Sequence, residues 1–138
     1  MKRIAILGAK GQLGRSMLHV FHQQQVQYDI TQLDADELDI SNASAVQQFF
    51  EKNNPFDIII NCAAYTAVDK AEAEASQAFA VNYEGPQHLV QFMPASCIFI
   101  HISTDFVFDG RKEGAYTETD ATQPLSVYGK SKEKGEQA

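Results

Sequence analysis

A glycine-rich turn between an apolar run and an amphipathic segment limits most strongly how this chain can fold. Gly8, Gly11 and Gly14 lie in the stretch GAKGQLG, which directly follows the apolar run RIAILG. The first glycine permits a tight turn, the second lets the backbone approach a pyrophosphate, and the third lets a helix pack on a strand. Unpaired N–H groups at the start of such a helix attract phosphate. The pattern predicts a strand, a phosphate-binding turn and a helix, in that order.

An acidic residue follows at the distance that a dinucleotide site requires. Asp34 ends the next apolar run and lies twenty residues after Gly14. A carboxylate there accepts hydrogen bonds from the adenosine ribose and repels a 2′-phosphate, which favours NADH. Lys10, within the turn, offsets that repulsion. We therefore expect the cofactor to be NADPH or NADH.

Apolar runs alternate with amphipathic segments along the whole chain. Leucine, methionine and phenylalanine at every fourth position predict a helix from Leu13 to about Gln25. Four apolar runs predict buried strands, at Arg3 to Gly8, Tyr28 to Asp34, Phe56 to Asn61 and Cys97 to Ser103. Strands alternating with helices predict an α/β fold, an open Rossmann-like parallel sheet with helices on both faces. Residues 1–138 are expected to form one cofactor-binding domain.

The remaining segments carry weaker signals. Leu38 to Ile40 is expected to be a short extended piece near the sheet edge, and Ser41 or Ser44 to cap the helix that follows. Residues 71–93 are alanine-rich and helical in propensity, and Gly85 and Pro86 are expected to interrupt or bend the helix. Residues 104–124 are expected to form a long loop before a final helix.

Composition excludes several classes of protein. The formal net charge is −7 and no dense basic cluster is present, which argues against nucleic-acid binding. Cys62 and Cys97 lack metal-ligand spacing and are expected to be buried, reduced thiols, so no metal site is expected. The apolar stretch at the N-terminus is too short for a signal peptide, and no segment is long enough to span a membrane. We expect a cytoplasmic protein.

The end of the chain carries a pair of residues suited to acid–base chemistry. Tyr128 and Lys132 are four apart, which places both on one face of a helix. An ammonium group beside a tyrosine favours the phenolate and lowers the pKa of the hydroxyl from about 10, so that proton transfer to a carbonyl becomes easier. Thr104, after the last strand, is positioned to donate to a substrate oxygen.

Four motifs together resemble the dTDP-4-dehydrorhamnose reductase family of extended short-chain dehydrogenases/reductases. They are GAKGQLG, NCAAYTAVDKAE, STDFVFDG and ETDATQPLSVYGKSKEKGE. The resemblance implies reduction of the C4 ketone of dTDP-4-dehydro-L-rhamnose with NADPH or NADH, in a homo-oligomer. Phe106 stands where the family usually has tyrosine, which removes one polar group near the substrate.

The resemblance also implies roles for individual residues. It places the cofactor against Gly8, Lys10, Gly11, Gln12, Leu13, Gly14, Asp34, Asp39, Ile40, Ala63, Ala64, Tyr65, Tyr128 and Lys132. It places the sugar nucleotide against Thr104 and Asp105, and makes Tyr128, Lys132 and Thr104 catalytic. Members of the family are considerably longer than this chain, and their C-terminal half supplies most of the substrate pocket. A separate substrate domain is therefore expected to be absent from residues 1–138.

Two other functions fit parts of the sequence. A sugar-nucleotide dehydratase or epimerase shares the fold and cofactor, but Phe106 follows Asp105 where a dehydratase carries a second acid. A nucleotide-binding or regulatory module needs no catalysis, but the Tyr128–Lys132 pair argues for an enzyme.

Overall fold

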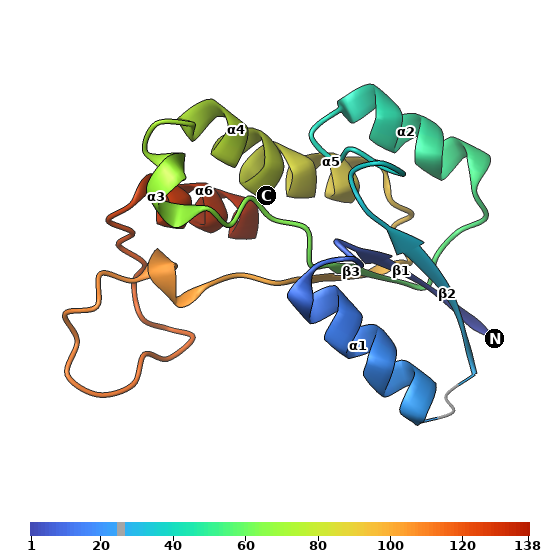
Figure 1. Ribbon diagram of the computed structural model, residues 1–138, viewed down its shortest axis with the longest axis horizontal. Coiled ribbons are helices and arrows are strands. Elements are labelled where there is room, and N and C mark those ends of the chain that lie inside the picture. The colour runs from blue at the N-terminus through green and yellow to red at the C-terminus, as the bar shows by residue number, and fades with distance from the viewer. Residues whose placement is uncertain (25–26) are drawn as a thin grey trace.

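The protein is built on a four-stranded parallel sheet with strand order β2-β1-β3-β4 (Figure 1). The computed structural model describes residues 1–24 and 27–138. The strands are β1 (Lys2–Leu7), β2 (Tyr28–Leu33), β3 (Ile58–Asn61) and β4 (Ile98–His101). All three neighbouring pairs are parallel. The predicted open α/β sheet is confirmed, and its short strands start and end within two residues of the apolar runs.

Helices cover both faces of the sheet, as Figure 1 shows. They are α1 (Gln12–Gln23), α2 (Ala43–Lys52), α3 (Val68–Ala71), α4 (Ala75–Phe79), α5 (Gly85–Phe92) and α6 (Val127–Glu136), with a π-helix at Ala80–Glu84 and a 3-10 helix at Asp105–Val107. Helix α1 lies on one face, and α2 and α5 lie on the other. The predicted end of α1 at about Gln25 falls outside the described residues.

Alternating side chains of the strands divide between two cores. Ile4, Ile6 and Ile60 face α1, whose Met17 and Phe21 pack against them. On the opposite face, a second cluster joins the sheet to α2 and α5, and its buried members include Ala5, Leu7, Ile59, Val46 and Leu89. Burial on both faces explains why the central strands read as continuous apolar runs.

The segment before α5 is less regular than the sequence predicts. The predicted helical stretch over residues 71–93 begins with the end of α3 and a turn, and continues without a break from α4 through the π-helix to α5. The expected irregularity at Gly85 and Pro86 is present, and Pro86 lies in the first turn of α5. Proline has no N–H to donate back along the helix, so a π-helix in the preceding turn accommodates the lost bond.

Two local predictions are wrong. Leu38 to Ile40 form no strand; the Leu38 and Asn42 N–H groups bond to the carbonyls of Asp34 and Asp39, and these turns carry Leu38 and Ile40 into the core. The cap of α2 is Asn42, whose side-chain oxygen accepts the N–H of Ala45 at 3.1 Å, and not Ser41 or Ser44. Asparagine caps a helix as effectively as serine, and Asn42 lies between the two serines that were predicted.

The last helix is packed into the domain. Tyr128, Gly129, Ser131, Lys132 and Gly135 of α6 are all buried. Its neighbours are α3, α4, α5, the π-helix and the 3-10 helix. Gly129 and Gly135 permit this close contact. A Cβ at Gly129 would lie 2.3 Å from the Phe106 carbonyl oxygen, and a Cβ at Gly135 would lie 2.1 Å from the Asn82 carbonyl oxygen.

Candidate active site

The glycine turn forms one end of the site. Gly8 has a φ of +72°, a conformation that L side chains rarely adopt, and a Cβ there would lie 2.7 Å from the Ala63 backbone nitrogen. A Cβ on Gly14 would lie 2.4 Å from the Gly8 carbonyl oxygen. These contacts force glycine at both positions and bring the start of α1 close to the carboxyl ends of β1 and β3. Gly11 is the N-cap of α1, and a Cβ there would lie 3.1 Å from the Gly8 carbonyl oxygen.

Asp34 is held beside this turn. Its Oδ2 atom accepts the backbone N–H of Lys10 at 2.9 Å, so the carboxylate lies at the end of β2 against the glycine loop. The Lys10 ammonium does not pair with Asp34 but with two other acids, since its Nζ atom lies 3.3 Å from both Asp36 and Glu37. Hydrogen bonds to these two carboxylates raise the pKa of Lys10. In this arrangement the lysine charge is already paired with acids.

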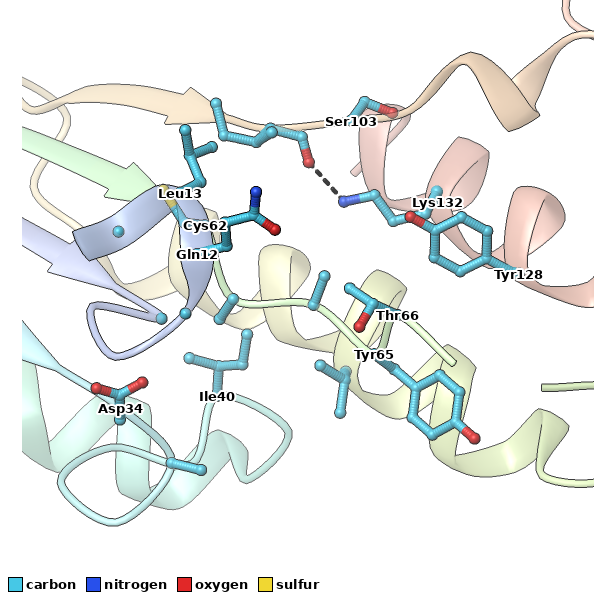
Figure 2. A pocket seen from close by; sticks show the side chains of 18 of the residues that line it. Gln12, Leu13, Asp34, Ile40, Cys62, Tyr65, Thr66, Ser103, Tyr128 and Lys132 are labelled. Atoms are coloured by element: carbon cyan, nitrogen blue, oxygen red, sulfur yellow. Dashed lines mark hydrogen bonds between the residues drawn. The ribbon is translucent and has the colours of Figure 1, made fainter. Parts of the chain in front are cut away.

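A cavity of about 680 Å³ runs from the glycine turn to α6 (Figure 2). The residues that line it are Gly8, Gly11, Gln12, Leu13, Gly14, Asp34, Ala35, Asp39, Ile40, Cys62, Ala63, Ala64, Tyr65, Thr66, Val81, Ile102, Ser103, Tyr128 and Lys132. Thirteen of the fourteen residues that the resemblance assigns to the cofactor are in this set, and Lys10 is the exception. Their contact with a cofactor stays a prediction.

Tyr128 and Lys132 lie side by side at the end of the cavity away from Asp34 (Figure 2). Ser126 caps α6 by accepting the N–H of Gly129, and the helix begins at Val127, one residue before Tyr128. The ring of Phe106 contacts that of Tyr128 edge to face, with centroids 5.7 Å apart. The residue that departs from the family pattern therefore packs on the predicted proton donor.

Lys132 is almost fully buried, with 2% of its surface exposed. Its Nζ atom donates to the carbonyl oxygen of Ile102 at 2.5 Å. Burial lowers the pKa of Lys132 to about 8, and the negative charge of Glu136 partly opposes this. The lysine is charged at neutral pH but close to its titration point.

Asn82, in the π-helix, was not singled out from the sequence. It is fully buried; its Oδ1 accepts the Tyr65 N–H at 2.8 Å, and its Nδ2 donates to the Tyr65 carbonyl and to Ser131 Oγ, each at 3.0 Å. One side chain thus joins the cavity wall after β3 to α6. A polar residue inside an otherwise helical, alanine-rich segment was the available signal.

The predicted substrate residues lie outside the main cavity. Thr104 caps the 3-10 helix, accepting the N–H of Phe106 at 3.2 Å, and its hydroxyl donates to Asp105 at 3.3 Å. Asp105 borders a second hollow of about 360 Å³, together with Phe108, Tyr116 and Leu125. Ser103, for which the sequence predicted no role, lines the main cavity instead.

Within residues 1–24 and 27–138, no three side chains of histidine, cysteine, aspartate or glutamate are grouped so as to hold a metal ion. Over the same residues, none of the helices has the length and apolar character that a membrane crossing requires.

Comparison with known proteins identifies the family of this chain. The family described as RmlD substrate binding domain matches residues 1–138, the full sequence. This chain belongs to the RmlD, or dTDP-4-dehydrorhamnose reductase, family. It is 47% identical over 137 residues to a dTDP-4-dehydrorhamnose reductase of Aggregatibacter actinomycetemcomitans, covering 99% of this chain and 46% of that protein. The enzyme of that name from Streptomyces griseus is 39% identical, with 99% and 44% covered.

Solved structures of the RmlD family share the fold. The dTDP-4-dehydrorhamnose reductase of Clostridium acetobutylicum superposes with a TM-score of 0.89 and 38% identity, over 98% of this chain and 48% of that one. The Bacillus anthracis protein, a complex with NADP, gives 0.88 and 39%, over 99% and 48%. The chain therefore spans about half the length of the RmlD relatives that it matches.

Proposed function

We propose that this chain carries the cofactor site and the acid–base pair of a reductase that transfers a hydride from NAD(P)H to the C4 ketone of dTDP-4-dehydro-L-rhamnose. One observation carries the proposal: the glycine turn, Asp34, Tyr128 and Lys132 all line a single cavity. A relative that shares 39% of the sequence is a complex with NADP. The relatives are named for the ketone that they reduce.

The cavity suits an extended dinucleotide. A pyrophosphate would lie at the start of α1, where a Cβ on Gly8 or Gly14 would collide with backbone and where the N–H groups of the first turn are unpaired. Asp34 would hold the adenosine ribose, with Asp39 and Ile40 beside the adenine. Ala63, Ala64 and Tyr65 would line the path toward α6. When bound, the nicotinamide supplies the hydride.

The protein's own residues would then manage the proton. Tyr128 would donate its hydroxyl proton to the ketone oxygen as negative charge develops there. Lys132 would stabilise the resulting phenolate through its charge and would hydrogen-bond the nicotinamide ribose. Thr104 would have to exchange its contact with Asp105 for the substrate oxygen, since its hydroxyl is otherwise engaged.

Binding of the sugar nucleotide is assigned to Thr104, Asp105 and residues outside this chain. Because the chain spans about half of its relatives, turnover requires the rest of such a protein. A dTDP-sugar substrate, a homo-oligomeric assembly and a cytoplasmic location remain predictions from the resemblance.

The experiment is a cofactor titration of this chain followed by an assay in a full-length form. The chain should quench or enhance NADPH fluorescence in a saturable way, and the full-length protein should oxidise NADPH only when the dTDP-sugar ketone is present. Net oxidation of NADPH separates a reductase from a dehydratase or epimerase, which regenerates its cofactor. A folded chain that shows no saturation at millimolar NADPH or NADH contradicts the proposal.

A further inference from the structure

His101 lies behind Lys132, at the end of β4, and has no part in the function proposed above. Its Nε2 atom is 3.5 Å from Lys132 Nζ, and its Nδ1 atom is 3.1 Å from Nδ2 of Asn61, on β3. The imidazole stacks on Phe99, with centroids 6.0 Å apart and an interplanar angle of 11°. The ring is therefore held between a strand neighbour and the buried lysine.

The hydrogen bonds around Asn61 determine which ring nitrogen carries the proton. The Ala63 N–H donates to Asn61 Oδ1 at 3.1 Å, so the amide oxygen faces Ala63 and the NH2 group faces His101. An NH2 group only donates, and Nδ1 of His101 must accept. In the neutral ring the proton then lies on Nε2, and that N–H points at Lys132.

This tautomer has a consequence for the lysine. An Nε2–H group cannot accept a hydrogen bond from the ammonium, so one of the three N–H groups of Lys132 bonds to Ile102 and two are left for the cavity. We propose that His101 is a positioning residue, fixed by Asn61 as the Nε2–H tautomer, which directs the Lys132 ammonium toward the cavity and favours loss of its proton. The statement about the tautomer stands without any cofactor, while its use in catalysis rests on the proposed function.

The charges around the pair agree with this assignment. Burial and then the lysine charge lower the pKa of His101 to about 4, so the ring is neutral at pH 7. The other titratable groups that face Lys132 are Glu136 and Tyr128 on α6 and Cys62 after β3. Glu136 is itself held by a hydrogen bond from the Ser103 hydroxyl.

The test uses NMR on this chain with 15N-histidine and 13C-lysine labels, without cofactor. Signals of His101 and Lys132 are assigned by their loss in His101→Phe and Lys132→Met. In the unmodified chain, the 15N shifts should show the Nε2–H tautomer from pH 6 to 8. A proton on Nδ1, or a charged ring at pH 7, overturns the proposal.

Asn61→Asp tests the coupling with a nearly isosteric change. A carboxylate accepts only, so it should move the histidine proton to Nδ1, and Nε2 then accepts from Lys132. The titration midpoint of Lys132 should rise by about one pH unit. The added negative charge could raise it directly, so the double variant Asn61→Asp/His101→Phe is the control. The rise should be mostly lost there; an equal rise in the double variant, or none in the single one, overturns the proposal.

An NADPH titration of the same proteins separates the two hypotheses. Failure of the unmodified chain to bind NADPH contradicts the proposed function but leaves the tautomer and the lysine midpoint measurable. If NADPH binds, its affinity should fall at alkaline pH with the Lys132 midpoint, and the fall should shift upward in Asn61→Asp. An NADPH affinity that does not change as Lys132 titrates contradicts the catalytic use of His101.

Discussion

The side-chain amide of Asn82 donates to Ser131 Oγ at 3.0 Å and so joins the π-helix to α6 across the core. The same side chain makes two hydrogen bonds with the backbone of Tyr65. The cavity wall after β3 and the helix of Tyr128 therefore share one buried polar residue. Ser131 in turn donates to the Tyr128 carbonyl at 2.7 Å, which continues the connection toward the predicted proton donor.

Asn82→Leu should destabilise the domain by roughly 2–4 kcal/mol, because three hydrogen bonds are lost and half-buried backbone groups of Tyr65 are left unpaired. Chemical denaturation measures the change. Gln47→Ala is the matched control, since Gln47 lies on the exposed surface of α2 and its side chain donates a hydrogen bond to Glu51, one turn along the same helix. An Asn82 variant as stable as this control would show that the bridge is unimportant.

Gly11→Val and Gly14→Val should separate ligand binding from folding. A Cβ at Gly11 meets only the Gly8 carbonyl oxygen, at 3.1 Å, so the fold should adjust while the added side chain blocks phosphate. A Cβ at Gly14 would lie 2.4 Å from that oxygen, so the second variant should lose stability, by about 3 kcal/mol or more. Thermal melts and NADPH titrations test both. Retained binding in a folded Gly11 variant would contradict the phosphate assignment.

Tyr128→Phe in a full-length form should lower kcat by about 10²–10⁴ and leave cofactor affinity nearly unchanged. The hydroxyl acts when charge develops on the ketone oxygen, whereas the ring retains its contact with Phe106. Steady-state kinetics and a parallel NADPH titration distinguish these effects. A near-normal kcat would mean that another group supplies the proton.

Lys132→Met should impair function but stabilise the ligand-free fold at pH 7, by about 1–3 kcal/mol. The folded pKa of Lys132, about 8, lies below its ordinary value of 10.5, so the folded state releases a proton that the unfolded state keeps between these pH values. The unmodified protein should therefore gain stability as pH rises from about 8 to 10.5, and its deficit relative to Lys132→Met should shrink. Denaturation at pH 7 and pH 10 checks the sign. A deficit that grows with pH would contradict it.

The edge of the sheet should make this chain self-associate. β4 pairs only with β3 among the described strands, and its Ile98 and Ile100 are 54% and 42% exposed. Light scattering should show dimers or larger species, and Ile98→Lys/Ile100→Lys should reduce them, because charges on an edge oppose strand pairing. Val90→Lys, on the opposite face in α5, is the control. A strictly monomeric parent chain would contradict this prediction.

Local sequence determined the elements that depend on nearest neighbours. The apolar runs became strands because burial on both faces requires continuous apolar residues, as at Ile58–Asn61. The glycine turn was readable because Gly8 must adopt a positive φ and Gly14 must approach backbone, and only glycine does both without strain. The four-residue spacing of Tyr128 and Lys132 likewise placed both on one helical face.

Tertiary structure alone decided what surrounds those elements. Leu38 and Ile40 turn into the core instead of forming a strand, because the helices above the sheet leave apolar space there. Lys10, which the resemblance places against the cofactor, forms ion pairs with Asp36 and Glu37, and a local motif does not reveal these pairs. Asn61 and His101 meet because the parallel strands β3 and β4 end side by side, and Lys132 of α6 reaches His101 from a helix packed at that end; no sequence spacing encodes these contacts.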